Sequence, residues 1–290
     1  MSLIDYLQQN ITIFLTFIGL LGLILGSFLN VVIHRLPIMM EREWKTQCNE
    51  LLNLPQEDST APFNLNTPRS RCPGCGHQIR AIENIPVISY LFLRGRCSEC
   101  GTGISLRYPL VELLTCLLSV SVAWYFGFSW QTAAALSLTW ALVALSLIDF
   151  DHQLLPDSIT LPFLWIGLLL SLFGIFTDPQ PAIIGAAVGY LSLWSLYHLF
   201  RLLTGKEGMG YGDFKLLALF GAWLGWQALP QIIIISSFVG AIIGIALILF
   251  RGRDRNIPIP FGPYLAIAGW ISLLWGEQIN QSYLRLAGLS

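Results

Sequence analysis

Charged side chains are scarce in this sequence of 290 residues. Only 11% of the residues are charged, whereas 54% are hydrophobic, and the mean hydropathy is +0.64. Soluble domains typically carry about 25% charged residues, so this scarcity excludes an ordinary soluble globular protein and a disordered chain. The net charge of −1 leaves no basic field that would attract nucleic acid. The composition therefore predicts an all-α polytopic membrane protein.

Several familiar enzyme motifs are also absent. The sequence has no H-E-x-x-H, no P-loop and no Ser-His-Asp order. Residues 34–107 contain no pattern of a strand followed by a glycine-rich turn, as in dinucleotide-binding folds. The first apolar run has no basic residue before it and no A-x-A site after it, so we interpret it as a membrane helix rather than a cleaved signal peptide.

Apolar runs long enough, or nearly long enough, to cross a bilayer recur along the chain. The pattern predicts about eight transmembrane helices, the last of them interrupted by glycine and proline. They cover residues 11–33, 108–126, 132–148, 159–176, 182–203, 214–229, 231–250 and 261–275.

Basic residues predict the orientation of these helices, because cytoplasmic loops are enriched in Lys and Arg. If the N-terminus lies outside, 15 of the 16 basic residues face the cytoplasm, and only Arg285 does not. The large polar segment 34–107 and the loops 149–158, 204–213 and 251–260 are then cytoplasmic. Whatever chemistry the polar residues perform is therefore expected on that side.

Four of the six cysteines form two C-x2-C pairs separated by 21 residues. They are Cys72, Cys75, Cys97 and Cys100. This spacing is typical of a four-cysteine zinc site, and four thiolates close the coordination shell as structural sites do. Disulfides and an iron–sulfur cluster are the competing interpretations. We interpret His77, which lies beside the first pair, as an ordinary loop histidine.

Two acidic clusters border the predicted spans, where a charge is costly and hence often functional. Asp149 and Asp151 end the third span, where the helix dipole disfavours negative charge, and Asp213 opens the sixth after Gly210 and Gly212. Asp157 is expected to cap the fourth span, and capping is also an alternative for Asp213.

Both clusters lie on the same predicted side of the membrane, so one Asp from each can meet. Two carboxylates in one site do not both ionise cheaply; one then deprotonates water while the protonated one polarises a carbonyl, as in aspartic proteases. Asp149 and Asp151 are two residues apart and project to different helix faces. Spacing alone therefore leaves open which of them pairs with Asp213.

The chain resembles the bacterial type IV prepilin peptidases, a family of membrane aspartic proteases, over nearly its whole length. The resemblance rests on five motifs taken together in this order. They are GSFLNVVIHRLP at 26–37, the two cysteine pairs, DFDHQLLPD at 149–157, GYGD at 210–213 and PFGPY at 260–264.

This resemblance implies both an activity and a site. Asp149 and Asp213 would be the catalytic pair, and Cys72, Cys75, Cys97 and Cys100 would hold one structural zinc. The substrates would be type IV prepilins and type II secretion pseudopilins, cleaved on the cytoplasmic face of the bacterial inner membrane. The new N-terminal residue would then be methylated from S-adenosylmethionine, for which the sequence indicates no binding residues.

The implied organisation has three parts. Residues 11–33 would form the first transmembrane helix, 34–107 a small cytoplasmic zinc-binding segment with the methyltransferase part, and 108–276 a seven-helix peptidase domain. Three alternatives remain open: a leader peptidase without methylation, a carboxylate-relay transporter, and a zinc-dependent docking scaffold. The oligomeric state is not indicated.

Overall fold

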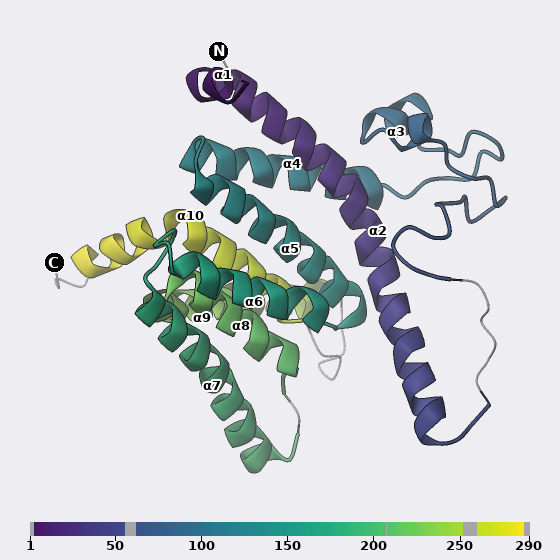
Figure 1. Ribbon diagram of the computed structural model, residues 1–290. Coiled ribbons are helices and arrows are strands. Elements are labelled where there is room, and N and C mark those ends of the chain that lie inside the picture. Colours follow the sequence, from purple (N-terminus) through teal and green to yellow (C-terminus); the bar gives the residue numbers. More distant parts are fainter. Residues whose placement is uncertain (1–2, 56–61, 207, 252–259, 287–290) are drawn as a thin grey trace. The chain divides into compact units, whose positions relative to one another are not determined.

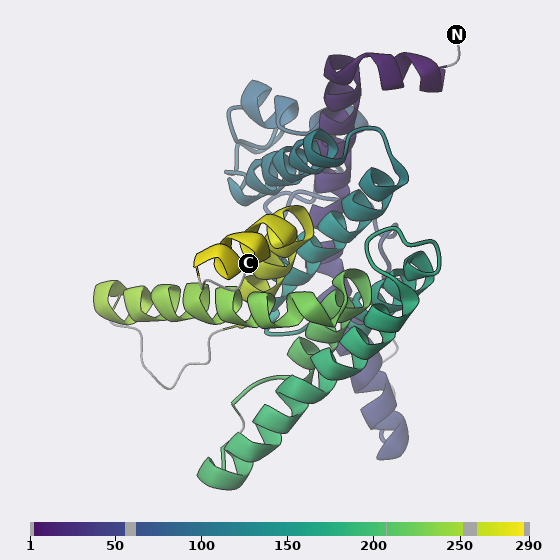
Figure 2. The ribbon, with the colours of Figure 1, turned by 90° about the vertical axis from the view of Figure 1, so that its left-hand side faces the viewer.

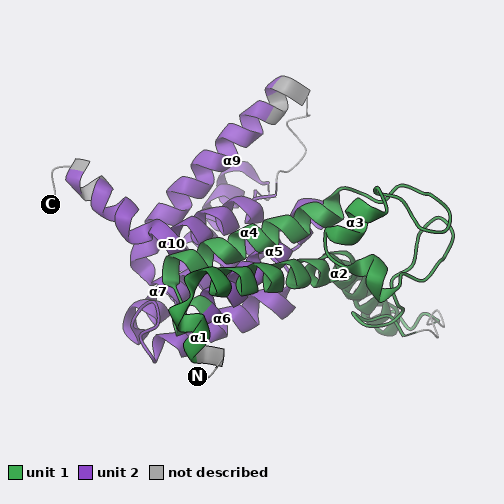
Figure 3. Cartoon of the chain, turned by 90° about the horizontal axis from the view of Figure 1, so that it is seen from above, with its two compact units in different colours: residues 1–132 green, residues 133–290 purple. Residues whose placement is uncertain are grey.

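The computed structural model describes residues 3–55, 62–206, 208–251 and 260–286 (Figure 1). Within these ranges the chain is predominantly helical, with two isolated β-bridges and no sheet. The all-α prediction is therefore confirmed. The chain divides into two compact units, residues 1–132 and residues 133–290 (Figure 3).

The first unit is built around two long helices that pack against each other. Its elements are α1 (Leu3–Gln9), α2 (Ile11–Leu51), η1 (Ala81–Asn84), α3 (Ile88–Phe92) and α4 (Arg107–Phe126). Glycines let α2 approach α4 closely, because a Cβ on Gly22 would lie 2.9 Å from the Cα of Cys116, and one on Gly26 would lie 2.7 Å from the Cα of Glu112. Small residues at such crossings are typical of helix pairs in membranes.

Helix α2 is much longer than the span predicted from hydropathy, which ended at residue 33. The helix continues through Pro37 to Leu51 with a polar sequence. An ion pair of 2.7 Å between Glu41 and Lys45, one helical turn apart, supports this extension. Hydropathy detects only the apolar part of such a helix.

The second unit is packed around α8, most of whose residues are buried. Its elements are α5 (Trp130–His152, apart from its first turn), α6 (Asp157–Ser171), α7 (Pro179–Thr204), α8 (Tyr211–Leu224), η2 (Trp226–Ala228), α9 (Leu229–Arg251) and α10 (Gly262–Leu286). Helices α6, α7 and α10 all contact α8, and α10 lies alongside α9 (Figure 2). The indole N–H of Trp223 donates to the carbonyl of Phe163 at 2.7 Å and ties α8 to α6.

Each predicted span contains a helix in the structure. Five described segments are long and apolar enough to cross a membrane: α2, α4, α5, α7 and Trp226–Ala246. Helices α6 and α8 have 15 and 14 residues, fewer than the roughly 17 that a straight span needs. The protein is thus a multi-pass membrane protein, while the number of eight spans stays a prediction. Residues 252–259, most of the predicted loop 251–260, lie outside the described residues.

Candidate active site and metal centre

Asp149 lies in the last turn of α5, where its carboxylate finds a partner on another helix. The backbone N–H of Gly262, the first residue of α10, donates to Oδ2 of Asp149 at 3.0 Å. A Cβ on Gly262 would lie 2.6 Å from the same oxygen. The glycine of the PFGPY motif therefore lets the start of α10 come close enough to bind this carboxylate.

Asp213 lies in the first turn of α8, where the helix dipole favours negative charge. The preceding Gly212 packs against the segment after α5, since a Cβ there would lie 2.7 Å from the Cβ of Leu155. Asp149 and Asp213 are only 6% and 7% exposed, and the two carboxylates interact electrostatically. The fold of the second unit thus brings together one acid from each sequence cluster.

The structure separates the remaining acids of these clusters from this pair. Asp151 is exposed, so the buried partner of Asp213 is Asp149. The capping predicted for Asp157 is wrong: Pro156 occupies the N-cap, and both Asp157 oxygens lie 2.7 Å from Nζ of Lys215. Asp213 likewise does not occupy the N-cap of α8, which is Gly210.

The two cysteine pairs form two loops of the same construction. In the first, the amide of Cys72 binds the carbonyl of His77 at 2.8 Å, and Gly76 adopts a positive φ of 73°. In the second, the amide of Cys97 binds the carbonyl of Thr102 at 2.8 Å, and Gly101 has φ 70°. Positive φ favours glycine and turns the backbone back toward the thiols.

The four sulfurs converge in a geometry that fits a tetrahedral metal ion. All four Sγ atoms lie within 4.8 Å of one another, with 3.7 Å between Cys72 and Cys100 and 4.0 Å between Cys75 and Cys97. Zinc with four sulfurs at about 2.3 Å requires sulfurs about 3.8 Å apart. The Sγ of Cys100 also lies 3.1 Å from the hydroxyl of Thr102, a contact that helps to hold this sulfur in place.

His77 contributes more than the ordinary loop histidine that was predicted. Its Nε2 lies 3.2 Å from Glu83 in η1, and its Nδ1 lies 3.4 Å from Glu99 in the second cysteine loop. Glu83 also accepts from the Arg80 amide and the Ser98 hydroxyl, and these hydrogen bonds lower the pKa of Glu83 to about 2. These contacts link both cysteine loops to the segment between them.

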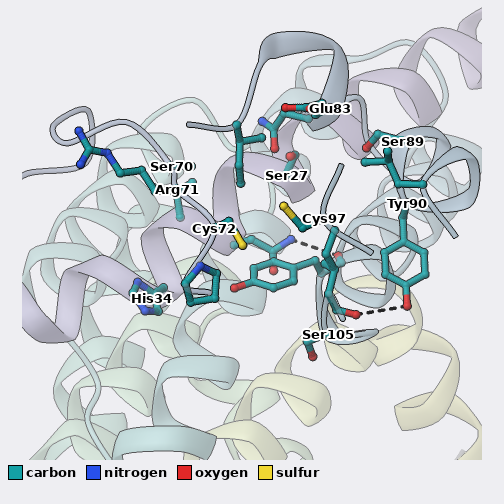
Figure 4. A pocket seen from close by; sticks show the side chains of 18 of the residues that line it. Ser27, His34, Ser70, Arg71, Cys72, Glu83, Ser89, Tyr90, Cys97 and Ser105 are labelled. Atoms are coloured by element: carbon teal, nitrogen blue, oxygen red, sulfur yellow. Dashed lines mark hydrogen bonds between the residues drawn. The ribbon is translucent and has the colours of Figure 1, made fainter. Parts of the chain in front are cut away.

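Next to the cysteine loops lies a cavity of about 580 Å³ formed within the first unit. Its walls come from α2, the cysteine loops, the η1–α3 segment and the start of α4. Figure 4 shows the sulfurs of Cys72 and Cys97 in its wall, with His34 to one side and Tyr90 to the other. Two further lining residues, Asn30 and Tyr108, are joined by a hydrogen bond of 3.1 Å.

Two signals in the sequence indicated this cavity, but the sequence interpretation did not use them. The first is a run of polar residues on one face of an otherwise apolar helix: Ser27, Asn30, His34 and Arg35 recur at helical spacing and all line the cavity. The second is Glu112, an acid inside the predicted span 108–126 that is only 7% exposed. An acid within a span is a functional candidate.

Comparison with known proteins identifies the family. Residues 20–126 match the model of the bacterial peptidase A24 N-terminal domain, and residues 136–245 match the model of the type IV leader peptidase family. The chain belongs to the type IV leader peptidase family. The resemblance inferred from the motifs is therefore confirmed, and the two family models fall on opposite sides of the boundary between the units.

Relatives in this family are similar to the chain over its whole length. It is 60% identical over 289 residues to the prepilin leader peptidase/N-methyltransferase of Stutzerimonas stutzeri, covering 100% of both chains. It is 59% identical over 288 residues to the protein of that name from Pseudomonas aeruginosa, covering 99% of both. The protein of that name from Aeromonas hydrophila is 60% identical over 273 residues, covering 94% of both. No solved structure matches the chain.

Proposed function

We propose that this chain is a membrane aspartic endopeptidase that removes the leader peptide of type IV prepilins and type II secretion pseudopilins. The observation that supports this proposal is the pair of buried, electrostatically coupled carboxylates of Asp149 and Asp213. Both lie at helix ends rather than in mid-helix, which favours a protease over a carboxylate-relay transporter.

The pair would act by general acid–base catalysis. Repulsion in a buried site keeps one proton on the pair, so one carboxylate accepts a proton from water while the other carboxyl donates a hydrogen bond to the scissile carbonyl oxygen. The water oxygen bonds to the carbonyl carbon. The C–N bond then breaks as the leaving nitrogen takes a proton. Gly210 lies three residues before Asp213 and leaves room for an extended substrate backbone, since a Cβ there would lie 4.0 Å from Oδ2 of Asp213.

The same chain would then methylate the new N-terminal amine. S-adenosylmethionine would supply the methyl group for this amine. One structural zinc ion would be held by Cys72, Cys75, Cys97 and Cys100. The methyltransferase part is assigned to the segment 34–107, and the peptidase part to residues 108–276.

The proposed location is the bacterial inner membrane, with the N-terminus outside and both sites accessible from the cytoplasm. The count of basic residues on each side supports this orientation. It places the peptidase pair on the side where the short leader of a membrane-inserted prepilin would be found. The lipid bilayer is thus a second partner of the chain besides its substrates.

Mass spectrometry of purified prepilin incubated with the enzyme in detergent tests the proposal. We expect leader loss with the wild type, and one added methyl group when S-adenosylmethionine is present. Asp149→Asn and Asp213→Asn should each slow cleavage by roughly a hundredfold to ten-thousandfold, because each removes a proton-transfer group.

Asp151→Asn is the matched control, since Asp151 lies two residues from Asp149 but is exposed. It should cleave at the wild-type rate. Normal cleavage by the Asp149 and Asp213 variants would contradict the dyad and favour the docking scaffold. Cleavage without methylation would leave a peptidase only.

A further inference from the structure

The cavity beside the cysteine loops has the size of a small-molecule site. Its volume of about 580 Å³ falls within the roughly 300–1,000 Å³ typical of ligand pockets. All of its walls come from the first unit, so it is complete without residues 133–290. None of its lining residues belongs to the proposed peptidase pair.

Charges of both signs are buried in its walls. Arg35 is 8% exposed and Glu112 is 7% exposed, and both line the cavity. The Arg35 guanidinium donates to the carbonyls of Asn64 and Pro68 at 2.9 and 2.6 Å. These contacts orient the guanidinium, but the carbonyls are neutral and do not balance its positive charge. A ligand that carries both a cation and a carboxylate is complementary to such walls.

Glu112 retains capacity to bind a cation. Its carboxylate accepts from the amide of Val87 at 2.7 Å and from the side chain of Ser27, whereas a carboxylate offers about four acceptor positions. Glu83, the other acid in the wall, is already engaged by the Arg80 amide, the Ser98 hydroxyl and His77. Glu112 is therefore the acid with most capacity left for a ligand.

Val87 itself is held in an unusual conformation on the cavity wall. Its φ is 60°, a value that β-branched residues rarely adopt, and its amide is the one bound by Glu112. Such strain is concentrated at ligand sites, where surrounding contacts hold it in place.

Aromatic rings complete the lining. Tyr90 and Tyr108 border the cavity, and the Tyr90 hydroxyl is 3.4 Å from the carbonyl of Ile104 (Figure 4). Rings of this kind stack on purine bases, and apolar side chains such as those of Val31 and Ile79 also line the cavity.

We propose that this cavity binds S-adenosylmethionine, with Glu112 facing the cationic part of the ligand and Arg35 its carboxylate. The ligand class matches the walls: an adenine for the rings, a sulfonium and an ammonium for the acid, and a carboxylate for the guanidinium. The inference rests on the proposed methyltransferase activity and deepens it by assigning its ligand site.

Equilibrium binding of S-adenosylmethionine to the full-length, zinc-loaded enzyme in detergent tests this assignment without any pilin. Glu112→Gln keeps the shape and an acceptor for the Val87 amide but removes the charge, so its affinity should fall about tenfold or more. Glu43→Gln, an exposed glutamate on α2 outside the cavity, is the matched control and should bind as the wild type does.

Thermal unfolding curves that match the wild type show that the variants are folded, and leader cleavage is measured on the same samples. Glu112→Gln should cleave normally, whereas Asp149→Asn should bind S-adenosylmethionine normally and not cleave. Ultraviolet crosslinking of the labelled ligand to the wild type gives a readout that needs no variant. The label should map to peptides within residues 27–35 and 63–112.

The outcomes distinguish this inference from the proposed function. A wild type that methylates prepilin, with Glu112→Gln binding unchanged and label outside these peptides, would overturn the cavity assignment and leave the function intact. A wild type that neither methylates nor binds S-adenosylmethionine would overturn both the methyltransferase activity and this assignment.

Discussion

Asp149 is an acid at the end of a helix whose dipole disfavours it, and a single amide from another helix offsets that disadvantage. The amide belongs to Gly262, and the Oδ2 contact leaves no room for a Cβ. Residue spacing left two candidates for the partner of Asp213, Asp149 and Asp151. It did not distinguish them, because only tertiary packing buries one of the two. Burial and coupling to Asp213 are properties of the folded unit.

Replacing Gly262 tests how finely this carboxylate must be placed. Gly262→Ala should push Asp149 away from its amide partner and lower the cleavage rate by roughly tenfold to a hundredfold, since small misplacements of catalytic groups are costly. Leader release followed over time measures the rate. Unfolding curves that match the wild type would show that the effect is local. An unchanged rate would contradict this role of Gly262.

Whole elements were predictable to different degrees. The cysteine spacing predicted that the four sulfurs converge, as the two loops show, because two C-x2-C pairs at this spacing are typical of one shared metal site. The apolar runs located the helices but not the polar extension of α2 to Leu51 or of α10 to Leu286. The cavity was missed because its residues come from positions 27 to 112 and meet only in the folded unit.

The cysteine loops predict a measurable metal content. Purified enzyme should carry about one zinc ion per chain, and Cys97→Ser should lose it, because three thiolates hold zinc less tightly than four. Elemental analysis of the purified protein measures the metal. Cys116→Ser, a change in a cysteine outside the cluster, is the control and should retain zinc. A Cys97→Ser variant that retained as much zinc as the Cys116→Ser variant and the wild type would rule out this site.

The chain as a whole has a polar segment between its first two predicted spans, and the distribution of Lys and Arg predicts its orientation in the membrane. Composition predicted a multi-pass membrane protein correctly because it sums over many residues, whereas the orientation stays a prediction. Composition and charge counts do not predict how the helices pack within each unit, because packing depends on individual contacts such as that between Gly22 and Cys116.

Cysteine labelling in membrane vesicles tests the orientation. Cys48 is exposed on α2 and should react with a membrane-impermeant maleimide in inverted vesicles but not in right-side-out vesicles. Ser129→Cys in the short turn before α5, introduced into a Cys48→Ser background, should show the opposite pattern at residue 129 when the labelled peptides are identified by mass spectrometry. Labelling of Cys48 from the outside would reverse the proposed topology.

The segment between the cysteine loops carries Glu83, Val87 and Tyr90, all on the wall of the cavity. A metal bound by both loops acts as a cross-link that closes this segment and lowers the conformational entropy of its unbound states. Zinc and S-adenosylmethionine then become thermodynamically linked ligands, and each must raise the affinity of the other by the same factor. We expect S-adenosylmethionine to slow the loss of zinc to a chelator, and the Glu112→Gln enzyme to lose that protection.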